Sequence, residues 1–228
     1  MENAVAEQVL VVGASRGIGL ELVRQWREAG AVVWATARDD AGLQRLQALG
    51  ARTMRLDVAS PVSASSLAWQ LDGEAFDTVV VNAGVYGPEQ LAAPQPPTAQ
   101  DFDRVMRTNV LGPMQVVPQL LDALAPGARL GVVTSRMGSI GARTNASGWL
   151  YRASKAAANS VLRDLATVLE GRALCVALHP GWVRTDMGGP GADLSVADSA
   201  AGLRRVLAGL TPESHGGFFD HDGQRLPW

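Results

Sequence analysis

The stretch from residue 8 to residue 28 constrains the fold more than any other part of the sequence. Gln8–Val12 is a continuous apolar run of strand length, a glycine-rich turn over 13–19 follows it, and a helical pattern continues to Glu28. Glycines let the backbone approach a phosphate that a side chain would hold off, and the free N–H groups at a helix start favour anions. The pattern therefore predicts a phosphate-binding βα unit, although a tight turn without a ligand would look the same. The residues expected to contact a nucleotide here are Gly13, Ser15, Arg16, Gly17, Ile18 and Gly19.

Strands and helices alternate along the rest of the chain. Strand patterns cover 31–38, 52–56, 76–81, 130–134, 174–178 and 218–220, and helical patterns cover 40–49, 98–124, 149–170 and 195–210, with one more beginning near residue 60. This alternation indicates an α/β fold with a parallel sheet between helices. Because 228 residues with 47% apolar content can bury one large core, we expect a single Rossmann-type domain over 1–228, with a doubly wound parallel sheet of about seven strands. The proline-rich stretch at 94–97 is expected to be a loop.

Charge and composition argue against several partner classes. The 20 Lys+Arg and 22 Asp+Glu are scattered, so no basic stripe exists for nucleic acid or an anionic membrane. Residues 1–4 lack the basic region of a targeting signal, and no apolar run approaches the roughly 18 residues of a membrane span. The single cysteine, Cys175, excludes an intrachain disulfide and is expected to be a buried strand residue. We therefore expect a cytoplasmic protein without nucleic-acid, membrane or metal ligands.

The end of the second strand bears on cofactor choice. A dinucleotide-binding fold usually presents an acidic residue there to the adenosine ribose, but this chain presents Arg38. A guanidinium suits a 2′-phosphate, and Arg16 can reach the same group, so the two cations favour NADP over NAD. In the alternative interpretation, Arg38 only pairs with Asp39 or Asp40 in solvent.

The next two strand ends offer further cofactor contacts. Asp57, which Val58 follows, could accept a hydrogen bond from the adenine amine, or it could cap the helix that begins near Ser60. After the fourth strand come small residues that let the backbone pass close to a cofactor, namely Asn82, Ala83 and Gly84.

The candidate reactive groups lie between residues 135 and 155. In a helix, Tyr151 and Lys155 stand four residues apart on one face, so the ammonium lies beside the phenol. Such a cation favours the phenolate and should lower the pKa of Tyr151 from about 10 towards a working value. The phenol could then exchange a proton with a carbonyl or alcohol oxygen, which Ser135, at the end of the preceding strand, could also hold.

Pro113 interrupts the helical pattern at 98–124. Because proline lacks an N–H group, the carbonyl of Asn109 loses its helical partner. That carbonyl and the Asn109 side chain could anchor an ordered water that connects Lys155 to solvent, although a kink that only serves packing is the alternative.

The segment after the sixth strand is rich in glycine and proline, which is typical of a loop that closes over a site. We expect a short substrate loop near 182–195. His179 has no Ser, Cys or second His at catalytic or metal-binding spacing, so a structural or backbone-bonded role is expected.

Together these features resemble the short-chain dehydrogenase/reductase family over essentially the whole chain. The motifs that carry the resemblance are Gly13-x3-Gly17-x-Gly19, Asn82-Ala83-Gly84, Asn109, Ser135, Tyr151-x3-Lys155 and Pro180-Gly181. The segments around Ser135, Tyr151 and Pro180 look most like the C-factor and Sniffer-type carbonyl reductase branch.

The resemblance implies a role for each residue of this set. Tyr151 would be the acid/base and Ser135 would steady the carbonyl oxygen. Lys155 would bind the nicotinamide ribose and lower the pKa of Tyr151, and Asn109 would hold the relay water. The resemblance also implies cofactor contacts from Pro180, Gly181, Val183 and Thr185.

Three points in the sequence complicate the match. Val12 and Val81 replace a Thr and an Asn that form structural hydrogen bonds in the family. Ser139 competes with Ser135 for the catalytic role, and Ser135 is preferred because it directly ends the strand and Gly138 follows at the family's spacing.

Two functions remain in view. The first is an NADPH-dependent oxidoreductase that transfers a hydride between the cofactor and a carbonyl or alcohol; the second is a nucleotide-binding, C-factor-like signalling or regulatory protein with little turnover. Pocket walls for a small-molecule substrate could come from Tyr86, Trp149, Trp182 and Met187. The apolar helices at 98–124 and 149–170 also favour a homodimer or homotetramer.

Overall fold

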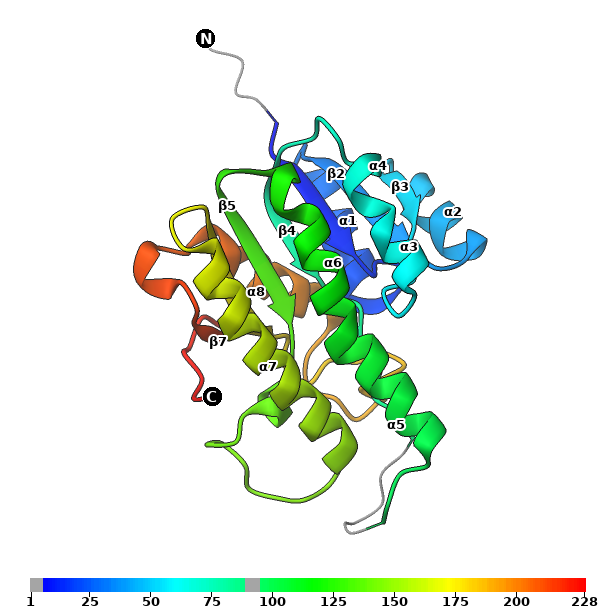
Figure 1. The fold of residues 1–228 in the computed structure, drawn as a ribbon, viewed down its shortest axis with the longest axis vertical. Coiled ribbons are helices and arrows are strands. Elements are labelled where there is room, and N and C mark those ends of the chain that lie inside the picture. The colour runs from blue at the N-terminus through cyan, green and yellow to red at the C-terminus, as the bar shows by residue number, and fades with distance from the viewer. Residues whose placement is uncertain (1–5, 89–94) are drawn as a thin grey trace.

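A computed structural model describes residues 6–88 and 95–228, so the expectations for residues 1–4 and for Pro94 lie outside the described residues. All seven strands are parallel and form one sheet in the order β3-β2-β1-β4-β5-β6-β7 (Figure 1). The expected seven-stranded Rossmann-type α/β fold is confirmed. The strands are β1 (Gln8–Val12), β2 (Val32–Ala37), β3 (Arg52–Arg55), β4 (Phe76–Val81), β5 (Leu124–Val133), β6 (Ala173–His179) and β7 (Phe218–Asp220).

Helices cover both faces of this sheet (Figure 1). Those on one face are α1 (Gly17–Glu28), α2 (Asp40–Ala48) and α8 (Val196–Ala208). Those on the other are α3 (Pro61–Ser65), α4 (Leu67–Gln70), α6 (Gly112–Leu120) and α7 (Trp149–Leu169), with α5 (Ala99–Met106) leading into α6. Among the described helices, none combines the length and the apolar character that a membrane crossing requires.

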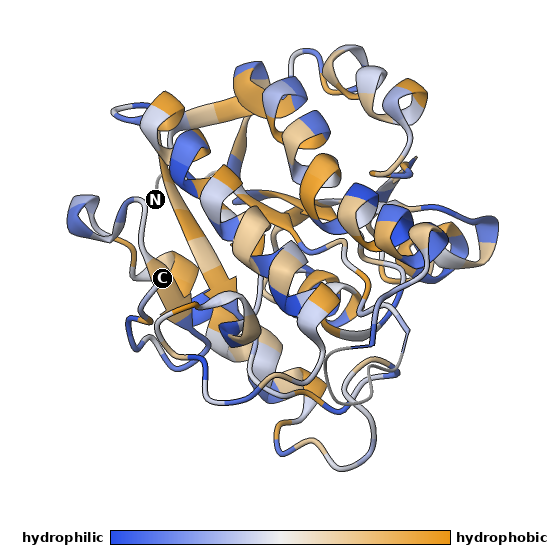
Figure 2. Cartoon of the chain, turned by 60° about the horizontal axis from the view of Figure 1, so that its bottom comes forward, coloured by the Kyte–Doolittle hydropathy of each residue, from blue (hydrophilic) through white to orange (hydrophobic). Residues whose placement is uncertain are grey.

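Alternation of side chains along each strand builds two separate cores. In β1, Val9 and Val11 pack under α1, α2 and α8, whereas Leu10 and Val12 pack under α6 and α7. All four are fully buried, as expected for a strand covered on both faces. Figure 2 shows the resulting pattern, in which apolar strands lie between helices that carry hydrophilic residues.

Side-chain caps fix the starts of α2, α3, α5 and α8. Asp39, Ser60, Thr98 and Ser195 each accept a hydrogen bond from a backbone N–H in the first turn of the helix that follows. A cap of this kind is worth about 1 kcal/mol, because it satisfies an N–H group that has no partner inside the helix.

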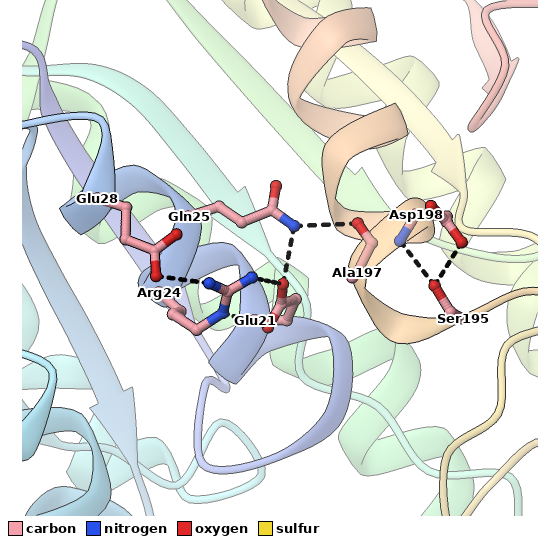
Figure 3. A network of polar contacts seen from close by, with 7 residues as sticks. All are labelled: Glu21, Arg24, Gln25, Glu28, Ser195, Ala197 and Asp198. Atoms are coloured by element: carbon pink, nitrogen blue, oxygen red, sulfur yellow. Dashed lines mark hydrogen bonds and ion pairs between the residues drawn. The ribbon is translucent and has the colours of Figure 1, made fainter.

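Polar contacts join α1 to α8 across the outer face of the molecule (Figure 3). The side chain of Gln25 donates to the carbonyl oxygen of Ala197 at 3.0 Å and to Glu21 at 2.8 Å. Arg24 binds both Glu21 and Glu28, so the exposed side of α1 carries its own ion pairs. The contact fixes α8, and the loop before it, relative to the helix that starts at the glycine turn.

The expected single helix over 98–124 is wrong. It divides into α5, a π-helical turn at Arg107–Leu111, and α6, and β5 already begins at Leu124, six residues before the expected strand. Pro113 cannot donate to the carbonyl of Asn109, and the chain widens so that the N–H of Gly112 bonds to Arg107 five residues back. Exposed Pro126 and Gly127 break the apolar run of β5, which hides its first half in the sequence. The other strand boundaries lie within two residues of those expected.

Candidate active site

An open cleft of about 410 Å³ lies at the carboxyl ends of the strands. The strand order reverses between β1 and β4, where parallel α/β sheets bind their ligands. Most of the residues expected from the sequence line this cleft: Gly13, Ser15, Arg16, Gly17, Ile18, Arg38, Asp57, Val58, Asn82, Ala83, Gly84, Tyr151, Lys155, Pro180 and Thr185.

The glycine turn forms a cradle at the floor of the cleft. Gly13 has φ +81°, and a Cβ there would lie 2.6 Å from the Cα of Ala83. Gly17 has φ +54°, and a Cβ there would meet only the Thr185 side chain, at 3.4 Å. Since the backbone at Gly17 is bare and begins α1, the turn fits a pyrophosphate.

Three residues expected to contact the cofactor instead shape the walls. A Cβ on Gly19 would lie 2.5 Å from the carbonyl oxygen of Gly13, so this glycine permits close packing of the turn on α1. Gly181 has φ +84° and lies against Leu194. Val183 is buried and bridges to Leu194, so it holds the substrate loop together.

The two replacements near the glycine turn are compensated. The N–H of Gly13 donates to the hydroxyl of Thr36 at 2.9 Å, and the Asn82 amide donates to the carbonyl of Gly13 at 2.7 Å. Thr36 is a buried β2 residue that could not be selected from the sequence, because its contact with Gly13 arises only when β1 and β2 pair. Val12 and Val81 therefore leave the turn fully braced.

The cations near the second strand end behave differently from each other. Asp39 caps α2 and Asp40 pairs with Arg55, so among the described residues no acidic side chain forms an ion pair with Arg38, which faces the cleft. Arg16 forms an ion pair with Asp186 at 2.5 Å, in the substrate loop 170 residues away. Asp186 also lines the cleft and was not expected from the sequence.

Asp57 does not cap the following helix, because Ser60 performs that role. One oxygen of Asp57 accepts from the N–H of Ala59 at 3.0 Å, which forms a local turn. The residue lines the cleft at the end of β3, as the adenine-binding interpretation requires.

The three candidate reactive side chains converge at the other end of the cleft. Tyr151 and Lys155 lie on one face of α7, with the Lys155 Nζ 5.7 Å from the centre of the Tyr151 ring. Ser135 follows β5, its hydroxyl accepts from the N–H of Met137 at 3.1 Å, and it lies close enough to the Tyr151 hydroxyl to lower the pKa of that phenol. Ser139 is committed elsewhere, since its hydroxyl donates to the carbonyl of Trp228 and accepts from Ala142. The geometry therefore favours Ser135 over Ser139.

Burial governs the ionisation of this group. It raises the pKa of Tyr151 to about 12, against a hydrogen bond from Ser135 that lowers it. Burial also lowers the pKa of Lys155 to about 8, and its Nζ donates to the carbonyl of Val133 at 3.1 Å. The pKa of Tyr151 is therefore raised, whereas the sequence predicted that Lys155 would lower it. Desolvation dominates, because the Lys155 ammonium lies over the face of the ring and donates to the Val133 carbonyl.

Asn109 is buried in the π-helical turn and ties three segments together. Its side chain accepts from the N–H of Val85 at 2.8 Å and donates to the carbonyl of Val85 at 2.8 Å and to the Ser154 hydroxyl at 3.0 Å. The amide is thus used in protein contacts, which leaves the carbonyl freed by Pro113 as the group that could bind a water. The buried Ser154, between Tyr151 and Lys155 in sequence, is a supporting residue that was not expected.

The four residues expected to form the pocket walls differ in their contacts and in their exposure. Tyr86 packs against Tyr151, with ring centres 4.6 Å apart and the ring planes tilted. Met187 lines the cleft, Trp182 is held by a hydrogen bond to the carbonyl of Gly188, and Trp149 begins α7. All but Tyr86 are substantially exposed.

His179 and Cys175 lie outside the reacting group. Burial lowers the pKa of His179 to about 4, and its Nδ1 has no hydrogen-bond partner within residues 6–88 and 95–228, so backbone bonding through that atom is not seen there. Cys175 is buried in β6 as expected, and burial raises its pKa to about 12.

The comparisons with known proteins show the family to which the chain belongs. The short chain dehydrogenase family model matches residues 7–193, and the chain belongs to that family. It is 44% identical to C-signal of Myxococcus xanthus over 155 residues, 67% of this chain and 92% of that protein. A short-chain dehydrogenase/reductase from Burkholderia multivorans with bound NADP has a TM-score of 0.89 and 34% identity, covering 98% of this chain and 100% of the other. The carbonyl reductase Sniffer of D. melanogaster has a TM-score of 0.88 and 26% identity with the same coverage. These similarities place the chain in the C-factor and Sniffer-like branch.

Proposed function

We propose that this protein is an NADPH-dependent carbonyl reductase, which transfers a hydride between the cofactor and a carbonyl or alcohol. The observation that carries the proposal is that Tyr151 and Lys155 line one end of a cleft whose floor is a glycine cradle, with Ser135 beside Tyr151. NADPH would supply the hydride, and the chain's own residues would bind the substrate and supply the proton.

Each residue has a separate task in this proposal. Ser135 and Tyr151 hold the carbonyl oxygen, and Tyr151 gives it a proton as the oxygen gains charge. A pKa of about 12 keeps Tyr151 protonated at neutral pH, which suits the reductive direction. Lys155 stabilises the Tyr151 phenolate that forms and holds the ribose, while Asn109 fixes Val85 and α7 and offers its carbonyl to a water through which the proton is replaced.

NADP is favoured over NAD by the charges at the far end of the cleft. Arg38 faces the cleft without an acidic partner among the described residues, and Arg16 lies in the adjacent turn. The structural neighbour from Burkholderia multivorans, which binds NADP, supports the same choice.

The test of the proposal incubates the protein with NADPH and a panel of aldehydes and ketones. Reduction is measured as the loss of NADPH absorbance. Reduction by the wild type and not by Tyr151→Phe would support it. Protein that binds NADPH but reduces no member of the panel would contradict it.

A signalling role is the second candidate, favoured by the similarity to C-signal. The two are separated by comparing NADPH turnover with NADPH binding, because a sensor needs only the second. Replacing Tyr151 by Phe would remove enzymatic function and leave nucleotide-dependent signalling intact.

We also propose a single domain that assembles as a homodimer or homotetramer. Phe102, Met114 and Val168 are exposed apolar side chains on α5, α6 and α7, where a partner subunit would cover them. Light scattering should give a mass well above the 23.9 kDa of one chain, and a monomer at micromolar concentration would contradict the assembly.

A further inference from the structure

The sequence contains two tyrosines, Tyr86 and Tyr151, and their rings pack against each other. The ring centres are 4.6 Å apart and the planes are inclined by 35°. This separation lies within the range of attractive aromatic pairs. The residue assigned as the proton donor therefore has an aromatic neighbour that comes from a loop 65 residues earlier.

Two supports fix the position of Tyr86. The preceding residue, Val85, is held by Asn109 at both its N–H and its carbonyl, each at 2.8 Å. The Tyr86 hydroxyl lies over Gly148, where a Cβ would come within 2.7 Å of that oxygen and 3.0 Å of the Met137 methyl. Gly148 also has φ +64°, so both its backbone and the space above it disfavour a side chain. Tyr86 is thus held as a fixed wall against the Tyr151 ring, next to Val85, which lines the cleft.

This wall limits how a substrate can reach Tyr151. Tyr151 is only 7% exposed, although a proton donor must touch its substrate, and Tyr86 covers one face of its ring. A flat group can lie against an aromatic face at van der Waals distance, whereas a puckered ring or branched chain needs more depth. A wall held at Val85 and packed against Gly148 cannot easily move aside to provide that depth.

We propose that Tyr86 is a specificity-determining residue that selects planar, apolar carbonyl compounds, aryl or conjugated, over saturated compounds of similar size. The inference rests on the proposed carbonyl reduction and adds a substrate class to it. Gly148 belongs to the same device, because it provides the space that the Tyr86 hydroxyl occupies.

The test compares acetophenone with cyclohexyl methyl ketone, which differ mainly in the flatness of the ring. The wild type should show a kcat/KM ratio of at least about tenfold in favour of acetophenone. Tyr86→Phe, which keeps the ring, should preserve this ratio, whereas Tyr86→Ala and the bulkier Tyr86→Leu should reduce it at least about fivefold. The matched control is Trp69→Ala on α4, which removes an aromatic side chain that is 72% exposed and outside the cleft.

A second measurement does not depend on turnover. Tyrosine labelled with ¹³C at Cζ gives two resonances, which the Tyr86→Phe variant assigns. Acetophenone added to the NADP⁺ complex should shift the Tyr86 resonance at lower concentration than cyclohexyl methyl ketone, and Tyr86→Leu should abolish the difference in affinity. Equal affinities in the wild type, or an unchanged preference in Tyr86→Leu, would overturn the role of Tyr86. Selective binding without reduction of either ketone would support it while contradicting the proposed function.

Discussion

The two ends of the cleft are built on opposite principles. At the Arg38 end, the charged side chains are in water: Arg16 and Asp186 are 65% and 77% exposed, and their ion pair is screened. At the Tyr151 end, Tyr151 and Lys155 are 7% and 5% exposed, Tyr151 lies beside Ser135, and Lys155 donates a hydrogen bond to the Val133 carbonyl. A charge change at the exposed end should therefore have local effects, whereas a change at the buried end is expected to alter the proposed proton transfer and folding together.

The largest effect is expected at the buried end. Tyr151→Phe should lower kcat by about 10²–10⁴-fold and leave NADPH binding unchanged, because the proton is needed only as the carbonyl becomes an alkoxide. Lys155→Ala should lower kcat and also raise the Kd for NADPH, since the ammonium acts on both ribose and phenol. Steady-state kinetics and fluorescence titration measure the two quantities. A Tyr151→Phe enzyme that keeps more than a tenth of the wild-type rate would exclude Tyr151 as the acid.

The next effect concerns cofactor choice at the exposed end. NADPH should bind well over tenfold more tightly than NADH, because a charge-assisted contact to the 2′-phosphate is worth about 1.5–3 kcal/mol. Arg38→Asp should reverse the preference, and Arg107→Asp, a charge change of the same size outside the cleft lining, serves as the control. Equal Kd values for the two cofactors in the wild type would contradict the role of Arg38.

A smaller effect links the buried cation to stability. Lys155 has a pKa of about 8 in the folded state against an ordinary value of 10.5, so below pH 8 the fold carries the cost of a buried charge. Stability from this group rises between pH 8 and 10.5, as the folded state loses the proton that the unfolded state retains. In the absence of cofactor, Lys155→Met should therefore stabilise the protein at pH 7 by about 1–2 kcal/mol, after the lost hydrogen bond to Val133 is counted, and the gain should fade towards pH 10.

Denaturant unfolding at several pH values measures that gain. Lys155 is the only lysine in the sequence, so ¹³C-lysine labelling gives one side-chain Cε signal whose titration reports its pKa directly. A titration midpoint near 10.5 in the folded protein would remove the basis of the prediction.

The smallest effect is expected at the Arg16–Asp186 pair. Asp186 competes with a 2′-phosphate for Arg16, so Asp186→Asn should tighten NADPH binding by about two- to fivefold and leave NADH binding unchanged. High salt should erase the gain, because both groups are exposed. If both cofactors bound more weakly instead, the pair would act as a clamp over the cleft, and the two ends would be less different than the exposures indicate.

The features that could be predicted from the sequence are those that depend on residues close together in the chain. Alternating apolar runs and helical periods gave the α/β fold, the glycine turn gave the cradle, and the i, i+4 spacing placed Tyr151 beside Lys155. The Ser195 cap of α8 has the same local basis, because a cap acts on the N–H groups of its own helix, whereas at α3 the cap is Ser60 and not the candidate Asp57.

The tertiary structure decided what depends on segments that are distant in the chain. The Thr36 hydroxyl reaches Gly13 only because β1 and β2 pair in register, and Arg16 meets Asp186 only because the substrate loop folds back over the glycine turn. Likewise, the spacing between Tyr151 and Lys155 correctly predicted that the two side chains are neighbours. It predicted a lowered pKa for Tyr151, which was wrong. A pKa depends on how much water the surrounding packing removes, and Tyr86, which covers that ring, reaches it from another strand end.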